Sequence, residues 1–407
     1  MKKNLFRLLI FLFLWPSLSF GQEYQRSLFE KTDHITIPFE FINGFVVLDI
    51  RYGSLPLKFI FDTGAEYSVL TYKEYAILNH ARFGKQVTIL GADLTSHIDA
   101  TIIHDNTIEL ANRLVIAHLD MILLNEDILN IGKYVGFPIH GILGANAFSR
   151  FAMEINYKKK LLIFHNPQSP VKKNFIEIPV TFKARKPYIQ MDVQMPNGEN
   201  FTGKYLVDCG ADLSLLLVLG SHPLLSTPQN TLVTNIASGL GGKLKGYMGR
   251  VKKINLGSTQ IPSPLIHYQE IPDSTHLRKF NSNGIVGNKI LSFFTVYIDY
   301  PRHKLYLKPN KRRSQTIPVD KSGLSIIASG PFLNHITVAQ VLPGTPADQA
   351  GILPGDIIHR IGIFAPRFIG IERVTKKLAR KDGKKIKMTL LRDGKKIKVQ
   401  FVLKTYI

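Results

Sequence analysis

Short runs of β-branched and aromatic residues, separated by glycine, proline and asparagine, dominate the hydrophobic pattern of this chain. Residues 35–41, 45–50 and 175–180 are examples, and runs of this length and composition are typical of strands. Helical periodicity is scarce, with short stretches such as residues 72–78 and 371–381 as the exceptions. The pattern therefore predicts a mostly β fold with few, short helices.

An internal repeat divides most of the chain into two similar parts. Residues 141–149 (GILGANAFS) return as residues 284–292 (GIVGNKILS), and the match continues without gaps at an offset of 143 residues. Upstream, residues 59–66 (FIFDTGAE) are matched by residues 205–212 (YLVDCGAD). Because both motifs occur in the same order in both parts, we interpret the parts as a duplicated β unit.

Both copies of the upstream motif end a strand-like run with an aspartate, Asp62 and Asp208. Such a strand delivers the carboxylate to a partly dry position, where burial raises its pKa, and the glycine two residues later permits a tight turn. If the two units pack about a pseudo-two-fold axis, the carboxylates face each other and share one proton. A pair of this kind can activate water and polarise a carbonyl group, so it can hydrolyse a peptide bond without a metal.

Residues 62–70 and 208–216 resemble the catalytic loops of retropepsin-like aspartic proteases, which belong to the pepsin and retropepsin superfamily. Residues 142–146 and 285–289 are similar to the apolar strand that threads beside each loop in that family. The resemblance covers most of residues 35–308. It implies two β lobes in one chain, with an extended peptide bound in the cleft between them. The implied catalytic residues are Asp62 and Asp208.

The resemblance also implies residues that support the loops and bind substrate. Residues 239–246 are similar to the glycine-rich flap that closes over substrate, and residues 90–94 occupy the corresponding place in the first part. Glu66 and Asp212 match a position that contacts the substrate backbone, although solvated loop acids are the simpler interpretation. The implied loop-supporting residues are Thr63, Gly64, Cys209 and Gly210, and the implied substrate-binding residues are Ala65, Glu66, Ala211, Asp212, Gly91, Ala92, Gly239, Leu240, Gly241 and Gly242.

Two positions depart from the family pattern. Cys209 replaces the usual threonine or serine, and a thiol is a weak hydrogen-bond donor. A catalytically weak or inactive protease-like scaffold that binds peptides is therefore the alternative function. Cys209 as a nucleophile is a further alternative, but the sequence identifies no histidine partner for it. The arginine that often follows the glycine of the retroviral threading motif is replaced by Ala145 and Asn288, and a covalent link between lobes could make its contact unnecessary.

Residues 318–407 follow a basic linker, residues 309–317, and resemble a PDZ domain. Residues 322–326 are similar to the loop and strand that hold a peptide C-terminus, and the periodicity of residues 371–381 predicts an amphipathic helix beside them. The resemblance implies that this domain recruits or orients a peptide; a purely structural or lid-like role is the alternative. The implied peptide-binding residues are Gly323, Leu324, Ser325, Ile326, Val374 and Leu378.

Residues 1–21 have the layout of a secretory signal peptide. Three basic residues precede an apolar run that is too short to span a bilayer, and small residues follow it. An uncleaved membrane anchor is the alternative. Residues 22–34 then lead into the two repeated parts, residues 35–168 and 174–308. The domain combination resembles that of exported bacterial proteases, so we expect a location in the periplasm or on the outer surface.

Composition narrows the remaining function classes. The chain has 52 Lys and Arg against 30 Asp and Glu, which gives a net charge of +22. This charge favours an anionic envelope surface as a partner besides the peptide substrate. Lysine side chains that are simply solvated at the surface are the simplest interpretation of the charge. A membrane-associated module is thus a third alternative. Nucleic-acid binding is not expected, because no nucleic-acid-binding fold is recognisable. The single cysteine excludes an intramolecular disulfide, and the 13 histidines show no metal-ligand spacing, so no metal or cofactor is expected.

Overall fold

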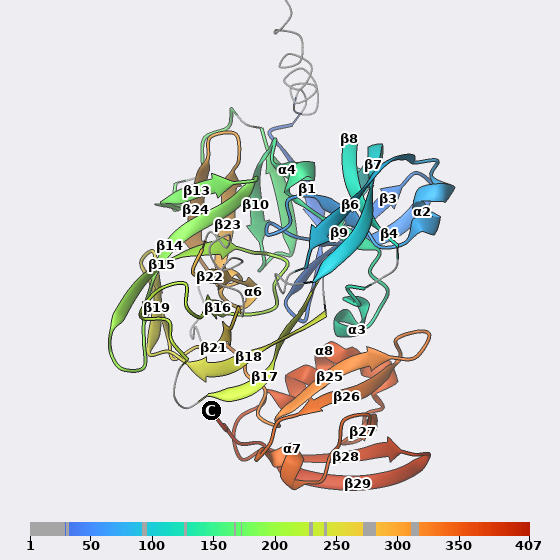
Figure 1. Cartoon of the computed structure of the whole chain (residues 1–407), viewed down its shortest axis with the longest axis vertical. Coiled ribbons are helices and arrows are strands. Elements are labelled where there is room, and N and C mark those ends of the chain that lie inside the picture. Colours follow the sequence, from blue (N-terminus) through green and yellow to red (C-terminus); the bar gives the residue numbers. More distant parts are fainter. Residues whose placement is uncertain are drawn as a thin grey trace, which may run out of the picture.

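The computed structural model describes residues 29–407, except for residues 30–31, 92–95, 126–127, 167, 172, 228–230, 240–241, 272–281 and 311–316 and the side chains of residues 234–245. Strands form four sheets and the helices are few and short (Figure 1), so the predicted mostly β class is confirmed. The predicted signal peptide lies outside the described residues. Among the helices that the structure does describe, none is long and apolar enough to cross a membrane.

Strands from both parts of the repeat meet in a six-stranded sheet. Its central pair is β10 (Ala152–Asn156) with β23 (Phe294–Asp299), and the antiparallel register places Glu154 opposite Tyr297. These two residues are equivalent in the repeat, at the offset of 143 residues, so a local pseudo-two-fold axis passes between them. The strand order is β1 (His34–Pro38), β11 (Leu161–His165), β10, β23, β24 (Lys304–Pro309) and β12 (Ile176–Ile178).

The first part of the repeat builds an eight-stranded sheet. Its inner strand β9 (Gly141–Leu143) is parallel to β4 (Leu55–Phe61) and antiparallel to β5 (Ser68–Leu70). The strand order is β2 (Glu40–Ile42), β3 (Phe45–Tyr52), β4, β9, β5, β8 (Leu114–Leu124), β7 (His97–Leu110) and β6 (Arg82–Leu90). Its helices are α2 (Lys73–Leu78), where the sequence predicts one, α3 (Gly132–Val135) and α4 (Ala145–Phe148).

The second part builds a ten-stranded sheet around the same arrangement. Its inner strand β22 (Gly284–Val286) is parallel to β15 (Asn200–Val207) and antiparallel to β16 (Leu215–Val218). The shared arrangement of the inner strands agrees with a duplicated unit. The order is β17 (Leu232–Gly239), β18 (Gly242–Arg250), β21 (Leu265–Gln269), β16, β22, β15, β14 (Lys186–Gln194), β19 (Lys253–Leu256) and β20 (Thr259–Pro262), with β13 (Val180–Lys183) paired to β14; the helix is α6 (Asn288–Leu291).

The C-terminal region forms a five-stranded sheet with two helices. Its longer helix, α8 (Pro366–Leu378), starts and ends earlier than the predicted helix over residues 371–381. It starts earlier because proline is compatible with the first turn of a helix. Gly370, with a φ of 72°, interrupts the regular helical backbone just before the predicted start. The strand order is β25 (Leu324–Ser329), β26 (His335–Val341), β27 (Ile357–Ile361), β28 (Lys385–Arg392) and β29 (Lys395–Val402), and the shorter helix is α7 (Pro346–Gln349).

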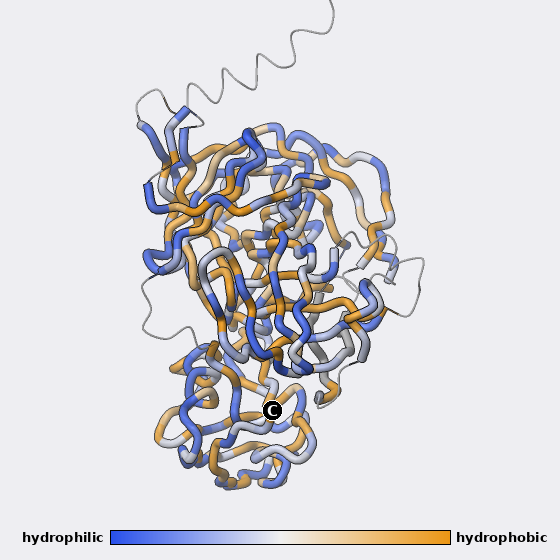
Figure 2. Tube along the Cα trace, turned by 90° about the vertical axis from the view of Figure 1, so that its left-hand side faces the viewer, coloured by the Kyte–Doolittle hydropathy of each residue, from blue (hydrophilic) through white to orange (hydrophobic). Residues whose placement is uncertain are grey.

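The C-terminal sheet is a separate body beside the other three sheets, and hydrophobic segments fill the interior of both bodies (Figure 2). Helix α3 of the first part packs against it. A Cβ atom at Gly132 would lie 3.1 Å from Leu333 Cδ1, and one at Gly136 would lie 3.2 Å from Ile371 Cγ2. The absence of side chains at these two positions lets the backbone of α3 approach the C-terminal sheet closely.

Candidate active site

Two equivalent strands end at Asp62 and Asp208. Strand β4 ends at Phe61 and β15 ends at Val207, so each aspartate is the first residue after its strand. The backbone amide of Asp62 donates to the carbonyl of Leu143 over 3.0 Å, and that of Asp208 donates to the carbonyl of Val286 over the same distance. The paired inner strands β9 and β22 therefore hold both aspartates in the same way.

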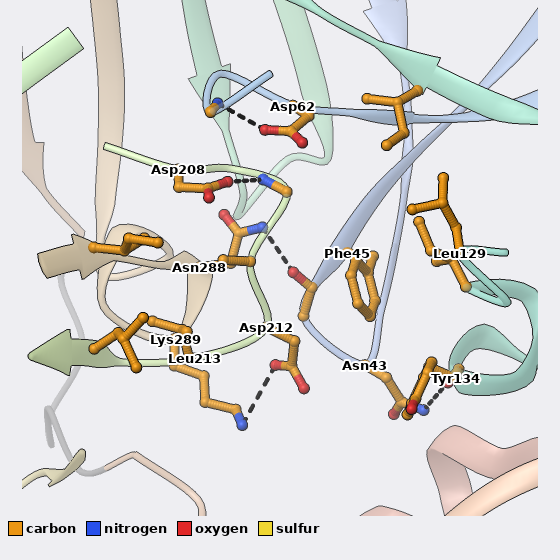
Figure 3. Close-up of a pocket in the computed structure, with 18 of the residues that line it drawn as sticks. Asn43, Phe45, Asp62, Leu129, Tyr134, Asp208, Asp212, Leu213, Asn288 and Lys289 are labelled. Carbon is orange, nitrogen blue, oxygen red and sulfur yellow. Dashed lines mark hydrogen bonds and ion pairs between the residues drawn. The ribbon is translucent and has the colours of Figure 1, made fainter. Parts of the chain in front are cut away.

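The carboxyl groups of Asp62 and Asp208 lie against each other, each beside the glycine of the opposite loop (Figure 3). A Cβ atom at Gly64 would lie 2.7 Å from Asp208 Cγ, and one at Gly210 would lie 2.3 Å from Asp62 Cγ. Neither site can therefore hold a side chain unless the opposite carboxyl group moves. The two carboxyl groups lie near enough to share a hydrogen bond when one of them carries a proton.

The surroundings of the pair favour one shared proton. Burial and the charge of Asp62 raise the pKa of Asp208 well above its ordinary value, and burial also raises the pKa of Asp62. The Asp62 carboxylate accepts the amides of Gly64 (2.6 Å) and Ala65 (3.1 Å), whereas Asp208 accepts only that of Gly210 (2.7 Å) among the described backbone amides. Because these amides stabilise a carboxylate, the negative charge resides mainly on Asp62 and the proton mainly on Asp208.

Thr63 connects the first aspartate loop to the second through hydrogen bonds of its side chain. Its buried hydroxyl donates to the carbonyl of Val207 over 2.7 Å and accepts the amide of Cys209 over 3.0 Å. The Cys209 thiol is fully buried, lies 3.4 Å from the Tyr157 hydroxyl and is within hydrogen-bonding range of Thr63. The position predicted to weaken the second loop thus still contacts the first loop, through a weaker donor than the usual hydroxyl.

Cys209 is expected to be chemically inert in the folded protein. Burial raises the pKa of its thiol to about 12, so almost no thiolate, the reactive form, exists at pH 8. Iodoacetamide at pH 8 is expected to alkylate Cys209 at least ~100-fold more slowly than a free cysteine, with full labelling once urea unfolds the chain. Mass spectrometry of the intact protein measures both rates. Rapid labelling of the folded chain would instead return Cys209 to consideration as a nucleophile.

Asn288 makes a contact between the two repeated parts that the sequence did not lead us to expect. Its side chain is fully buried, and its Nδ2 donates to the carbonyl oxygens of Gly44 (2.7 Å) and Cys209 (2.5 Å). The Tyr157 hydroxyl donates to its Oδ1 over 2.6 Å. This position therefore makes a contact between the two parts, although a covalent link already joins them. The Asn288 amide ties the β2–β3 turn to the second aspartate loop.

A cavity of about 1890 Å³ opens beside the aspartate pair. Glu66 and Asp212 both line this cavity. Each carboxylate forms an ion pair: Glu66 Oε1 lies 3.7 Å from a guanidinium nitrogen of Arg185, and Asp212 Oδ1 lies 3.4 Å from Lys289 Nζ. They are therefore not unpaired acids in solvent. Gly239 and Gly242 pair as the ends of β17 and β18. Ala92, Leu240 and Gly241 lie outside the described residues. The predicted residues that line the cavity are Asp62, Gly64, Ala65, Glu66, Gly91, Asp208, Gly210, Ala211 and Asp212.

The same cavity continues into the C-terminal region, where it runs between β25 and α8. Strand β25 is an edge strand: among the described strands it pairs with β26 on one side and with none on the other. Val374 does not line this space: it is fully buried in the core of the C-terminal sheet, and Thr375 lies at the surface of the cavity instead. The predicted residues that do line it are Leu324, Ser325, Ile326 and Leu378.

The loop before β25 already holds a carboxylate. The backbone amides of Ser322 and Gly323 donate to Asp320 over 2.9 and 2.6 Å. Gly323 has a φ of +84°, and a Cβ atom there would lie 2.1 Å from Thr345 Oγ1, so glycine is required. The amide of this predicted peptide-binding residue is thus occupied by a side chain of the same chain.

No cluster of metal ligands accompanies the site: within the described ranges, no group of three or more His, Cys, Asp or Glu side chains could hold a metal ion. Comparison with known proteins adds no further assignment, because no protein-family model and no curated protein matches the chain.

Proposed function

We propose that this protein is a single-chain aspartic endopeptidase of the retropepsin-like type. The observation that carries the proposal is the apposition of Asp62 and Asp208 across two equivalent loops, each beside a glycine that cannot hold a side chain. Two buried carboxyl groups so close together share a proton, and a pair with one proton supplies both a base and an acid. The large cavity beside the pair offers room for an extended peptide.

In this mechanism the Asp62 carboxylate takes a proton from a bound water, whose oxygen attacks the scissile carbonyl carbon. Asp208 gives its proton to the carbonyl oxygen as negative charge develops there. The tetrahedral intermediate collapses when the peptide nitrogen receives a proton from the pair and the carbon–nitrogen bond breaks. The pair regains its single proton from the hydroxyl groups of the intermediate, so the cycle needs no metal and no covalent acyl-enzyme.

The C-terminal region, which we propose to be PDZ-like, extends the peptide-binding surface. Its edge strand β25 lies in the same cavity as the aspartate pair, so a bound peptide can leave the pair and add alongside this strand. Because Asp320 already accepts the loop amides, we expect binding of an extended segment and not of a C-terminal carboxylate. The expected setting remains the bacterial envelope.

A peptide-binding scaffold without activity is the second candidate, and Cys209 is the observation that favours it. A mixture of decapeptides with varied sequences, incubated with the full chain and a chelator, separates the two functions by mass spectrometry. We expect endoproteolytic products that accumulate with time and do not depend on a metal. Peptides that are retained by the protein yet stay intact between pH 3 and pH 8 would establish the scaffold and overturn the peptidase.

A further inference from the structure

Two equivalent hairpins reach across the site from opposite parts of the repeat. The turn of β2–β3 consists of Asn43 and Gly44, with φ of 45° and 81°, and the turn of β13–β14 consists of Ala184 and Arg185, with φ of 50° and 59°. Two successive residues with positive φ form the tight turn typical of two-residue hairpins. Each turn contacts the other part of the repeat: Gly44 accepts from Asn288, and Arg185 pairs with Glu66.

The first residue after each turn lines the cavity, and here the repeat is asymmetric. In the first hairpin this residue is Phe45 (Figure 3). It packs with the buried side chains of Val47 and Ile60. In the second hairpin it is Lys186. Equivalent positions on the two sides of the aspartate pair thus hold an aromatic ring and an ammonium group.

Lys186 is half-buried and lines the cavity. No ion pair or hydrogen bond of its side chain is found in the part of the chain that the structure describes. Lys186, Asp62 and Asp208 line the same cavity, and the charge of Lys186 lowers the pKa of both aspartates against the stronger effect of burial. A half-buried cation gains from a carboxylate partner, and a bound peptide can supply one.

We propose that Lys186 makes the site selective for peptides with an acidic residue on its side of the scissile bond, with Phe45 accepting an apolar residue on the other side. This inference rests on the proposed peptidase function, since it names the substrate class of that site. Arg185 and Lys289 already pair with Glu66 and Asp212. Lys85, Lys158 and Lys160 also line the cavity, but Lys186 is the lysine whose charge acts on both Asp62 and Asp208.

The test compares peptide pairs that differ only by Glu or Gln at each position flanking the scissile bond. At one position, the wild-type protein is expected to cleave the Glu peptide with a kcat/KM about tenfold above that of the Gln peptide. The ratio of kcat/KM for the Glu peptide to that for the Gln peptide should fall to about 1 in Lys186→Met and persist in Lys186→Arg. In Lys186→Glu, a peptide with Lys at this position should be cleaved faster than the Glu peptide. Lys183→Met is the matched control, because Lys183 pairs with Lys186 across the hairpin but is exposed and does not line the cavity.

Binding separates this inference from the peptidase proposal. Fluorescence anisotropy of the same labelled peptides on Asp208→Asn measures the Glu-to-Gln preference without hydrolysis. A preference that Lys186→Met removes in this background supports the inference even if the wild-type protein cleaves nothing. The inference would be overturned if the Glu and Gln peptides were cleaved with the same kcat/KM and bound with the same affinity at every flanking position. A loss in Lys186→Met that is the same for both peptides would overturn it too, since such a loss assigns Lys186 to the reaction and not to selectivity.

Discussion

Replacement of Asp208 by asparagine is expected to lower kcat for peptide hydrolysis by about 10⁴-fold, and replacement of Asp62 by asparagine to do the same. Asparagine fills the same space and can still accept the loop amides, so the fold should be retained. It cannot share a proton, however, so either the base or the acid of the pair is lost. The double variant should be no less active than either single one, because the two carboxyl groups act as a unit.

The measurement is kcat from single peptide substrates, with unfolding temperature as the check on folding. Asp192→Asn is the matched control, because Asp192 lies on β14 of the same sheet but is exposed and bonded to Thr202 instead. In the wild-type protein, activity should fall in acid as the pair takes a second proton. It should fall again as pH rises and the last proton leaves, at a pH that burial raises above the ordinary carboxyl range. Variants that keep more than a tenth of the wild-type kcat would rule out the paired mechanism.

The sequence predicted the centre of the site because the repeat itself carries the geometry. Asp62 and Asp208 occupy equivalent places, so packing about a two-fold axis that passes close to their loops brings them together. The register of Glu154 opposite Tyr297 places that axis in the shared sheet. The mostly β class could be predicted for a different reason: the alternation and composition of a strand are local features of the sequence.

Features that depend on contacts between distant residues could not be predicted. Asn288 and Gly44 are 244 residues apart, and their hydrogen bond depends on a positive-φ turn whose position in space no local pattern gives. Lys186 reaches the cavity through an equivalent turn of Ala184 and Arg185, which lacks the usual Asn-Gly signal. The PDZ resemblance implies Val374 as a groove residue, but Val374 is fully buried, because the apolar stripe of a helix does not tell which of its residues face the sheet.

Replacement of Asn288 by leucine is expected to lower the free energy of unfolding by about 3 kcal/mol, because it leaves buried polar groups without partners. Leucine has nearly the shape of asparagine, so the loss comes from hydrogen bonds and not from a cavity. The carbonyl oxygens of Gly44 and Cys209 lose their donor, and the Tyr157 hydroxyl loses an acceptor. Since the Cys209 carbonyl belongs to the second aspartate loop, kcat should also fall, by about 10- to 100-fold.

Asn283→Leu separates the two effects. Asn283 belongs to the same part of the repeat, and its side chain bonds to Lys204 and Ser221. Among the described residues, its side chain makes no hydrogen bond to the first part or to the aspartate loops. Its variant should lose stability to a similar degree and keep its kcat, as measured by urea unfolding and by kinetics at a temperature where both variants are folded. If Asn288→Leu lost stability alone, the hydrogen bonds of Asn288 would hold the two parts together without positioning the aspartate pair. A loss of both stability and kcat in Asn288→Leu is expected if Asn288 joins the β2–β3 turn to the second aspartate loop and so positions the aspartate pair.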